Sequence, residues 1–568
     1  MTEVVPALVP APRQSAPSVL EGGGSDSGAS IWTIRPAFVA ALVLAMAGAC
    51  ALLLAWPGQT VTTKYVNDLF VFLDGAHRII AGQLPNRDFH TALGPLAFYV
   101  PAAGYWLSGS FGGAMPVGMA LAILVLAPAA AHIVSSRLQP ALAVPTAAFL
   151  LLVAAVPMNL GEGIGALSFA MFYNRFGWAV LGFLLIMYLP PRQPRPGQNL
   201  LDAACAALFV LLMLYMKISY GLVGLAFLMF MVLDSGQRGW AVAALAMVLA
   251  GGLAVEAVWG SSATYVSDLI LAGRVSGNLG SLDQLANVLF RNFADYVLFL
   301  LFMGLALART HRVRDLLFFG FCAASGFMLI KQNFQSWGIV TLSAGAAVAA
   351  EIMMRAERPS ADGRVWSMAA GAPLLLLALI LPPMVHNAAA LGLHAGVASM
   401  GRGQTFPLPN FDRIKLVKLW TEGEYPGFTK YLATLQNGAE ALASLGAKPG
   451  RVLVLDFANP FSAGLGLNPP QGDSPWYHWD RTLNEANFLP AEELFRDVQV
   501  VMDPKWAVEA WTADGLRRVY ADYLAQNYQL AQETADWKVY VPRQWPSEAA
   551  SRSVEPGSNK PVEGQPRG

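Results

Sequence analysis

Charged side chains are scarce in this sequence. They make up 13% of its 568 residues, whereas soluble domains carry about 25%. Basic and acidic residues balance to a net charge of zero, so the composition gives no electrostatic reason to expect nucleic acid as a partner. The mean hydropathy is +0.46, and several apolar runs reach membrane length. These features exclude an ordinary soluble enzyme and predict a protein that crosses a membrane many times.

Cysteine and histidine are also few. The three cysteines, Cys50, Cys205 and Cys322, lie in separate apolar runs, which favours buried thiols over a disulfide or a metal site. The seven histidines are scattered without the spacing of zinc ligands. No glycine-rich phosphate loop is present, so no nucleotide site and no metal ligands are predicted.

The apolar runs predict eleven membrane spans, and their bounds follow from hydropathy. A shorter, proline-interrupted piece at 95–109 is predicted to lie at the membrane interface. The first apolar run has no cleavage signature after it, so it is predicted to remain as an anchor and not to be a signal peptide. The predicted spans are 37–56, 115–135, 141–157, 176–190, 200–216, 218–233, 240–258, 293–308, 316–331, 337–350 and 366–384.

The loops between these spans predict the orientation. Arginines gather in alternate loops, for example Arg192 and Arg195 in one loop and Arg309, Arg312 and Arg314 in another. Because positive loops stay in the cytoplasm, the N-terminus of this multi-pass protein is predicted to be cytoplasmic. Loop 57–114 and the chain after 385 then lie on the outer, non-cytoplasmic side.

The chain therefore divides into four predicted parts. Residues 1–30 and 549–568 are predicted to be disordered tails, and 31–385 a membrane helix bundle. Residues 386–548 are predicted to form a small α/β domain outside the membrane, with strands at 451–457 and 497–502. A helix is predicted at 513–527 and a hairpin at 528–541. The predicted class is mainly α, a polytopic bundle with a small extracytoplasmic domain.

The first outer loop has an unusual concentration of charge for this chain. Residues 67–81 predict an amphipathic helix at the membrane surface, with Asp68 in its first turn. Asp74 and Arg78 lie off its apolar stripe at the spacing of an ordinary helical ion pair. Asp68 has no such partner. It either caps the helix or acts as a general base whose pKa is raised by partial burial.

Other charged residues of the outer loops are weaker candidates. Arg87, Asp88 and His90 follow a turn at Gly82–Pro85, where polar residues are usually solvated. Lys217 and Lys331 each end an apolar span shortly before a glycine opens the next span. Each either extends to the membrane surface or binds a lipid-linked phosphate.

A further outer loop carries three polar candidates. Arg175 stands where this loop re-enters the membrane, next to Asn174 and in the same loop as Glu162. It either pairs with Glu162 or clamps a phosphate.

The first outer loop resembles that of the C-type (GT-C) membrane glycosyltransferases. The match is to bacterial members grouped with dolichyl-phosphate-mannose protein mannosyltransferases and lipid A aminoarabinose transferases. The residues that carry it are Asp68, the run Gly82-Gln-Leu-Pro-Asn-Arg-Asp88-Phe89, and Gly94-Pro95-Leu96. Where many members have two adjacent acidic residues, this chain has Asn67-Asp68-Leu69, and Asn86 stands where an aromatic is frequent. The first departure leaves the use of a divalent metal open, and the second leaves the donor sugar open.

The resemblance implies transfer of a sugar from a polyprenyl-phosphate carrier to an acceptor hydroxyl on a glycan, lipid or protein. Asp68 is expected to be the general base of an inverting displacement, with Asp88 orienting the sugar or acceptor. Lys217, Lys331 and Arg175 are expected to bind the donor phosphate. Arg87, His90, Glu162 and Asn174 are the expected substrate-binding residues. A polysaccharide polymerase or ligase and a lipid-linked-sugar flippase remain as alternatives.

Overall fold

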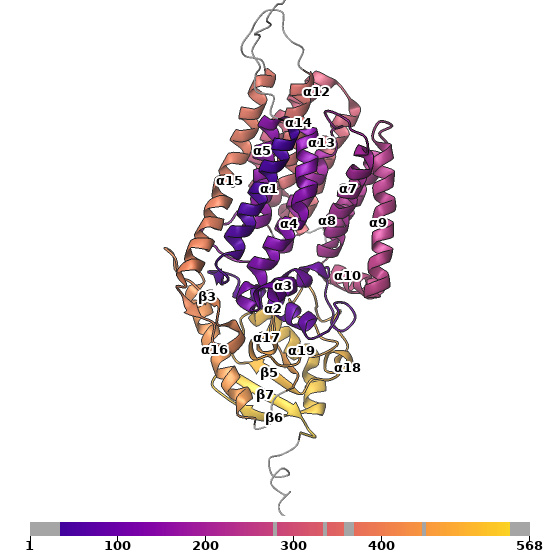
Figure 1. The fold of residues 1–568 in the computed structure, drawn as a ribbon. Coiled ribbons are helices and arrows are strands. Elements are labelled where there is room, and N and C mark those ends of the chain that lie inside the picture. The colour runs from indigo at the N-terminus through magenta and orange to yellow at the C-terminus, as the bar shows by residue number, and fades with distance from the viewer. Residues whose placement is uncertain are drawn as a thin grey trace, which may run out of the picture. The chain divides into compact units, whose positions relative to one another are not determined.

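The computed structural model describes residues 35–276, 281–332, 335, 338–356, 368–445 and 450–545. The predicted tails at 1–30 and 549–568 lie outside the described residues. Within the described part the chain is mainly helical, with a helix bundle followed by a small α/β domain (Figure 1). The predicted fold class is confirmed.

Each of the eleven predicted spans is a helix. Among the described residues, seven helices are long and apolar enough to cross a membrane, and α5, α6 and α8 are shorter apolar helices. The chain is therefore a multi-pass membrane protein. The bundle helices are α1 (Pro36–Ala55), α4 (Phe111–Arg137), α5 (Pro140–Ala155), α6 (Phe172–Ile186), α7 (Gln198–Met216), α8 (Ile218–Val232), α9 (Arg238–Trp259), α12 (Phe293–Thr310), α13 (Val313–Gln332), α14 (Val340–Ala356) and α15 (Met368–Met400).

The last bundle helix differs from its prediction. α15 continues to Met400, well beyond the predicted end at residue 384. Hydropathy predicted the end of the span at residue 384, but the helix continues through Pro382 and Pro383, because the residues that follow are mostly small or apolar and include good helix formers. The helix therefore continues across the domain boundary predicted at residue 386.

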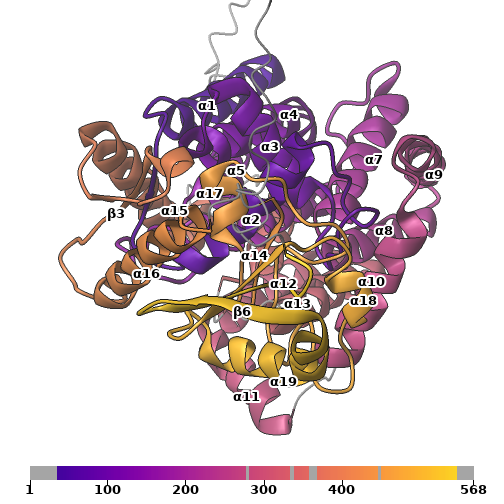
Figure 2. The same ribbon diagram turned by 90° about the horizontal axis from the view of Figure 1, so that it is seen from below.

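Among the described residues, four helices lie between predicted spans: α2 (Val66–Ile80), α3 (Leu96–Ser108), α10 (Ser262–Ser276) and α11 (Leu282–Arg291). α3 corresponds to the predicted interfacial piece and packs against α2 and α4. The contact between α2 and α3 requires Gly75, because a Cβ atom there would lie 2.1 Å from a ring carbon of Phe98. α2 is in turn covered by the C-terminal domain, with α17 (Pro460–Leu465) beside it (Figure 2).

The C-terminal domain contains a four-stranded sheet in the order β4-β5-β7-β6. β4 and β5 are parallel, and the β6–β7 hairpin adds two antiparallel strands. The predicted strands, helix and hairpin are all present, whereas α16 and the short helices were not predicted. The elements are α16 (Tyr425–Ala443), β4 (Val452–Val454), α18 (Ala491–Leu494), β5 (Val500–Pro504), α19 (Ala510–Asn527), β6 (Tyr528–Glu533) and β7 (Trp537–Pro542).

A second, smaller sheet connects distant parts of the chain. β1 (Thr60–Thr62), which follows the first bundle helix, pairs in parallel with β3 (Ile414–Leu416), which follows the last. β2 (Gln404–Thr405) completes this sheet. Asp68 lies shortly after β1, so this sheet fixes the start of α2 against the C-terminal domain.

Candidate active site

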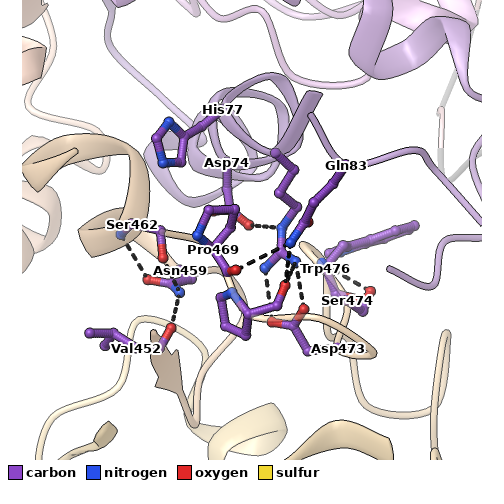
Figure 3. A network of polar contacts seen from close by, with 12 residues as sticks. Asp74, His77, Gln83, Val452, Asn459, Ser462, Pro469, Asp473, Ser474 and Trp476 are labelled. Carbon is purple, nitrogen blue, oxygen red and sulfur yellow. Dashed lines mark hydrogen bonds and ion pairs between the residues drawn. The ribbon is translucent and has the colours of Figure 1, made fainter. Parts of the chain in front are cut away.

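A buried ionic network fixes the middle of α2. Arg78 Nε lies 2.8 Å from Asp74 Oδ2, and its two terminal nitrogens lie 2.5 and 2.8 Å from the carboxylate oxygens of Asp473. Gln83 adds hydrogen bonds to the carbonyls of Pro469 and Pro470 (Figure 3). Arg78 and Asp74 are fully buried, which corrects the prediction that they lie off the buried face of the helix.

The charges of this network are compensated. Burial alone would lower the pKa of Arg78, but the carboxylates of Asp473 and Asp74 raise it above its usual value. The guanidinium also donates to the carbonyl of Pro470. A buried ion pair is tolerated when its charges and remaining donors are satisfied in this way. The network therefore holds α2 to the C-terminal domain.

Asp68 lies on the same helix in a different environment. Its side chain is partly buried, and it has no hydrogen-bond or ion-pair partner in the described part of the chain. The pKa of Asp68 is raised to about 7, and burial is the largest cause. The charge of Arg481 lowers this pKa, whereas the charges of Glu424, Glu509 and Glu162 raise it. It does not cap α2, since no side chain bonds the first turn of this helix. The capping interpretation is wrong.

The start of α6 lies next to Asp68. One turn along α2, the Phe72 ring lies 5.2 Å from the Phe172 ring and 6.0 Å from the Tyr173 ring, centre to centre. Lys217, between α7 and α8, places its Nζ atom 5.0 Å from the centre of the Tyr173 ring. The same Nζ donates to Asn174 Oδ1 at 2.9 Å. Residues from three distant segments thus meet around Tyr173.

Arg481, in a loop of the C-terminal domain, completes this group. Its positive charge acts on Asp68, on Tyr173 and on Lys217. The guanidinium carbon lies 5.3 Å from the centre of the Trp476 ring, a cation–π contact that positions the side chain. The sequence analysis did not identify Arg481, because no local motif surrounds it.

Arg175 is buried nearby on the first turn of α6. It donates to Asn159 Oδ1 at 2.9 Å and to the Ala170 carbonyl at 2.7 Å, and its Nε and second terminal nitrogen have no hydrogen-bond partner among the described residues. The expected pairing with Glu162 is wrong. Glu162 instead accepts from Lys64 Nζ at 3.1 Å and from Tyr65 OH at 2.6 Å. Arg175 is thus a buried cation with unused donors and no carboxylate partner in the described part.

Two further candidates of the first loop, Asp88 and Arg87, have partners within their own turn. Asp88 Oδ2 accepts from the Leu84 amide at 2.7 Å and lies 3.4 Å from the exposed Arg87 guanidinium. The Asp88 carboxylate therefore holds its own turn, and its expected role of orienting a sugar or acceptor stays a prediction. Arg87 is directed to the same carboxylate and does not contact Asp68.

His90 connects the first loop to two other segments. Its Nδ1 lies 2.7 Å from Asp268 Oδ1 and its Nε2 lies 3.0 Å from Glu493 Oε1. Burial alone would lower the pKa of His90, but the hydrogen bonds and charges of Asp268 and Glu493 raise it to about 9. His90 is therefore protonated at neutral pH and lies between two carboxylates.

Lys331 occupies the last turn of α13 and is partly buried. Nearby, Trp178 of α6 donates to Gln335 at 2.9 Å. The phosphate-binding role of Lys331 stays a prediction.

The described residues contain no group of three metal-ligating side chains.

The comparisons with known proteins give a limited likeness. No protein-family model matches the chain, and no curated protein matches it either. Two crystal structures of ArnT from Cupriavidus metallidurans are similar in outline. The structure bound to undecaprenyl phosphate has 14% identity and a TM-score of 0.44. The apo structure has 14% identity and a TM-score of 0.43. In both cases the match covers 88% of this chain and 97% of the other. At this identity, roles of individual side chains do not transfer between the chains.

Proposed function

We propose that this protein is a membrane glycosyltransferase that moves a sugar from a polyprenyl-phosphate carrier to an acceptor hydroxyl. One observation carries this proposal. The Asp68 carboxylate, which has no partner among the described residues, is close enough for its charge to act on Tyr173, over whose ring the Lys217 ammonium stands, and it lies within the field of Arg481. A base and cations held next to one another are what a displacement at a sugar carbon requires.

In this reaction Asp68 is the general base. The carboxylate removes the proton of the acceptor hydroxyl as its oxygen forms a bond to the sugar carbon. The bond from that carbon to the phosphate oxygen breaks, and its electron pair leaves with the phosphate. A pKa of about 7 suits this role, because the carboxylate is substantially ionised at neutral pH and basic enough to accept a proton. A single displacement inverts the configuration of the sugar carbon.

The cations act on the other side of the sugar. Lys217 and Arg481 stabilise the negative charge that develops on the leaving phosphate. Asn174 orients the Lys217 ammonium through the 2.9 Å hydrogen bond. Arg175 offers two unused donors, and an anionic oxygen would satisfy them better than any described neighbour does. Lys331 is a further candidate for the same phosphate.

The site is proposed to open on the outer side of the bacterial inner membrane. This follows from the arginine-rich loops, which favour a cytoplasmic N-terminus. Asp68 lies in the loop after the first span, which then faces the periplasm. The polyprenyl tail would remain among the apolar helices while its phosphate reaches Lys217 at the membrane surface.

The test uses cells that lack this chain and are complemented with wild type, Asp68→Asn or Asp514→Asn, a change at an exposed carboxylate. Mass spectrometry of the lipid extract measures polyprenyl-phosphate-linked sugars, which accumulate when no transferase consumes them. We expect accumulation with Asp68→Asn, as in the empty strain, and near wild-type consumption with Asp514→Asn. Normal consumption with Asp68→Asn would contradict the proposal. A flippase would only move the donor across the membrane, so the purified protein would not consume the donor and would release no free polyprenyl phosphate.

A further inference from the structure

The short helix α11 (Leu282–Arg291) is amphipathic, and yet none of its residues is buried. Its apolar side chains recur three or four residues apart, and its polar side chains lie on the opposite side of the helix. Ser281 caps the first turn by accepting from the Gln284 amide at 3.3 Å. Asp283 in the first turn and Arg291 in the last complement the helix dipole. The local sequence therefore specifies a helix with an apolar side that the bundle leaves largely uncovered.

The exposed apolar stripe of α11 consists of large side chains. Leu282 is 83% exposed, Phe290 70% and Leu289 39%. Val288 is half-buried and packs against the core of the bundle, and α11 contacts α12 and α13. The helix is thus held to the bundle along one edge. Contiguous apolar side chains left exposed in this way mark an interaction surface.

The stripe continues into the lipid-facing side of the next membrane span. Asn292 alone separates α11 from α12, and the Phe290 ring lies 6.5 Å from the Phe293 ring of α12, centre to centre. Phe293, Val297 and Leu301 are exposed at a spacing of four residues, which places them on one side of α12. Since α12 is long and apolar enough to cross a membrane, these side chains contact lipid. Lipid therefore already covers the surface that the α11 stripe extends.

α11 itself is suited to the boundary between lipid and water. Its ten residues span about 15 Å, half the thickness of the hydrocarbon layer, so it cannot cross the membrane. Gln284, Asn287 and Arg291 are exposed on its polar side, and such side chains are costly to place in hydrocarbon. Figure 2 shows α11 at the edge of the molecule. A short helix with one apolar and one polar exposed stripe is typical of a helix that lies in the membrane interface.

We propose that α11 binds the surface of the lipid bilayer on the side of the C-terminal domain, whatever reaction the protein catalyses. Its two charged residues, Asp283 and Arg291, cancel, so the attraction is apolar and requires no anionic lipid. The side of the membrane follows from α10, which ends at Ser276, shortly before α11. Asp268 of α10 lies 2.7 Å from His90 of the first loop. The lipid surface thus anchors the segment that holds this loop.

The test is electron paramagnetic resonance of nitroxide labels on the full chain in nanodiscs of palmitoyl-oleoyl phosphatidylcholine, which carries no net charge. One label at a time is attached to Leu282→Cys or Phe290→Cys on the apolar stripe, or to Gln284→Cys or Asn287→Cys on the polar side. The three native cysteines are buried and are replaced by alanine. Oxygen collides with labels in lipid and a water-soluble nickel complex with labels in water, so the ratio of the two collision rates gives the depth of each label.

We expect the labels of the apolar stripe to lie roughly 5–10 Å below the headgroups. The labels of the polar side should lie about 10 Å higher, which is the diameter of a helix. Equal depths for the two sides would overturn the proposal. So would labels on the apolar stripe that neither reagent reaches, because a second copy of the chain or another protein would then cover the stripe. All four labelled positions are exposed, and each side has two of them, so a variant that thermal unfolding shows to be misfolded is replaced by its neighbour.

Discussion

Asp68 and Asp74 lie on one helix, less than two turns apart, in opposite electrostatic situations. Asp74 is completely buried and bonded to Arg78, which also bonds Asp473 from the C-terminal domain. Asp68 has no partner in the described part of the chain, although Arg481 is close enough to act on it. The carboxylate of Asp74 is compensated by its partners, whereas that of Asp68 is left as the proposed base requires.

The comparison separates two costs. Charges removed from water are tolerated when partners replace the lost hydration, as they do around Arg78. A buried charge without partners destabilises the folded state. Such charges are found in proteins mainly at sites of function. Four predictions test this difference, and they descend in expected effect.

Asp68→Asn should have the largest effect on activity. Removal of a general base lowers the rate about a thousandfold, because no other described carboxylate occupies its place. Stability should be unchanged or increased, since the ionised Asp68 is costly to bury. Donor turnover and thermal unfolding of the purified variant measure the two properties. A large fall in the unfolding temperature would place Asp68 with the structural carboxylates instead.

Asp473→Asn should show the reverse pattern. Loss of one partner leaves the Arg78 charge partly uncompensated inside the protein, at a cost of about 3–5 kcal/mol in unfolding free energy. Asp514→Asn is the matched control, because Asp514 is 66% exposed and its pair with Arg517 is at the surface. Denaturant unfolding compares the two variants. Similar stability of both would mean that the buried network is not what holds α2.

Lys217→Met should weaken use of the donor by about tenfold, because a cation next to the leaving phosphate is lost. Lys418→Met removes an exposed lysine of the C-terminal domain and serves as the control. The readout is the KM for the polyprenyl-phosphate sugar. An unchanged KM in Lys217→Met would support the alternative in which this lysine merely extends to the membrane surface.

The pH dependence should give the smallest but most specific effect. Only the ionised carboxylate accepts a proton, so kcat/KM should rise with pH, with a midpoint at about 7 set by Asp68. Arg481 lowers that pKa, so Arg481→Met should move the midpoint to higher pH. The profile is measured with purified protein and donor. A midpoint that does not move in Arg481→Met would remove this arginine from the site.

The spans were predictable because hydropathy is a local property of the chain. The same holds for the β6–β7 hairpin and for α2, whose apolar spacing is visible in the sequence. The end of α15 was not, because hydropathy marks the end of an apolar run, and this helix continues beyond that point. α16 was missed because it begins in a stretch rich in glycine, proline and charge at 422–427.

The side-chain partners were less predictable, since they come from distant segments. Asp68 and Lys217 were identified because charge at a membrane boundary is unusual in itself. Arg481 was not, because nothing near residue 481 indicates that this loop approaches α2. The pair of Asp74 and Arg78 was recognised, but its burial depends on Asp473, almost 400 residues away in sequence. Arg175 and Glu162 share a loop and yet bond other residues.

The pairing of β1 with β3 has a consequence for biogenesis. A ribosome delivers Thr60–Thr62 early, but the strand that hydrogen-bonds it is synthesised only after the final bundle helix has been inserted. Until then the edge of β1 is open, and the start of α2 is not yet held through this sheet. A chain that ends before Ile414 therefore lacks the strand that fixes the position of Asp68.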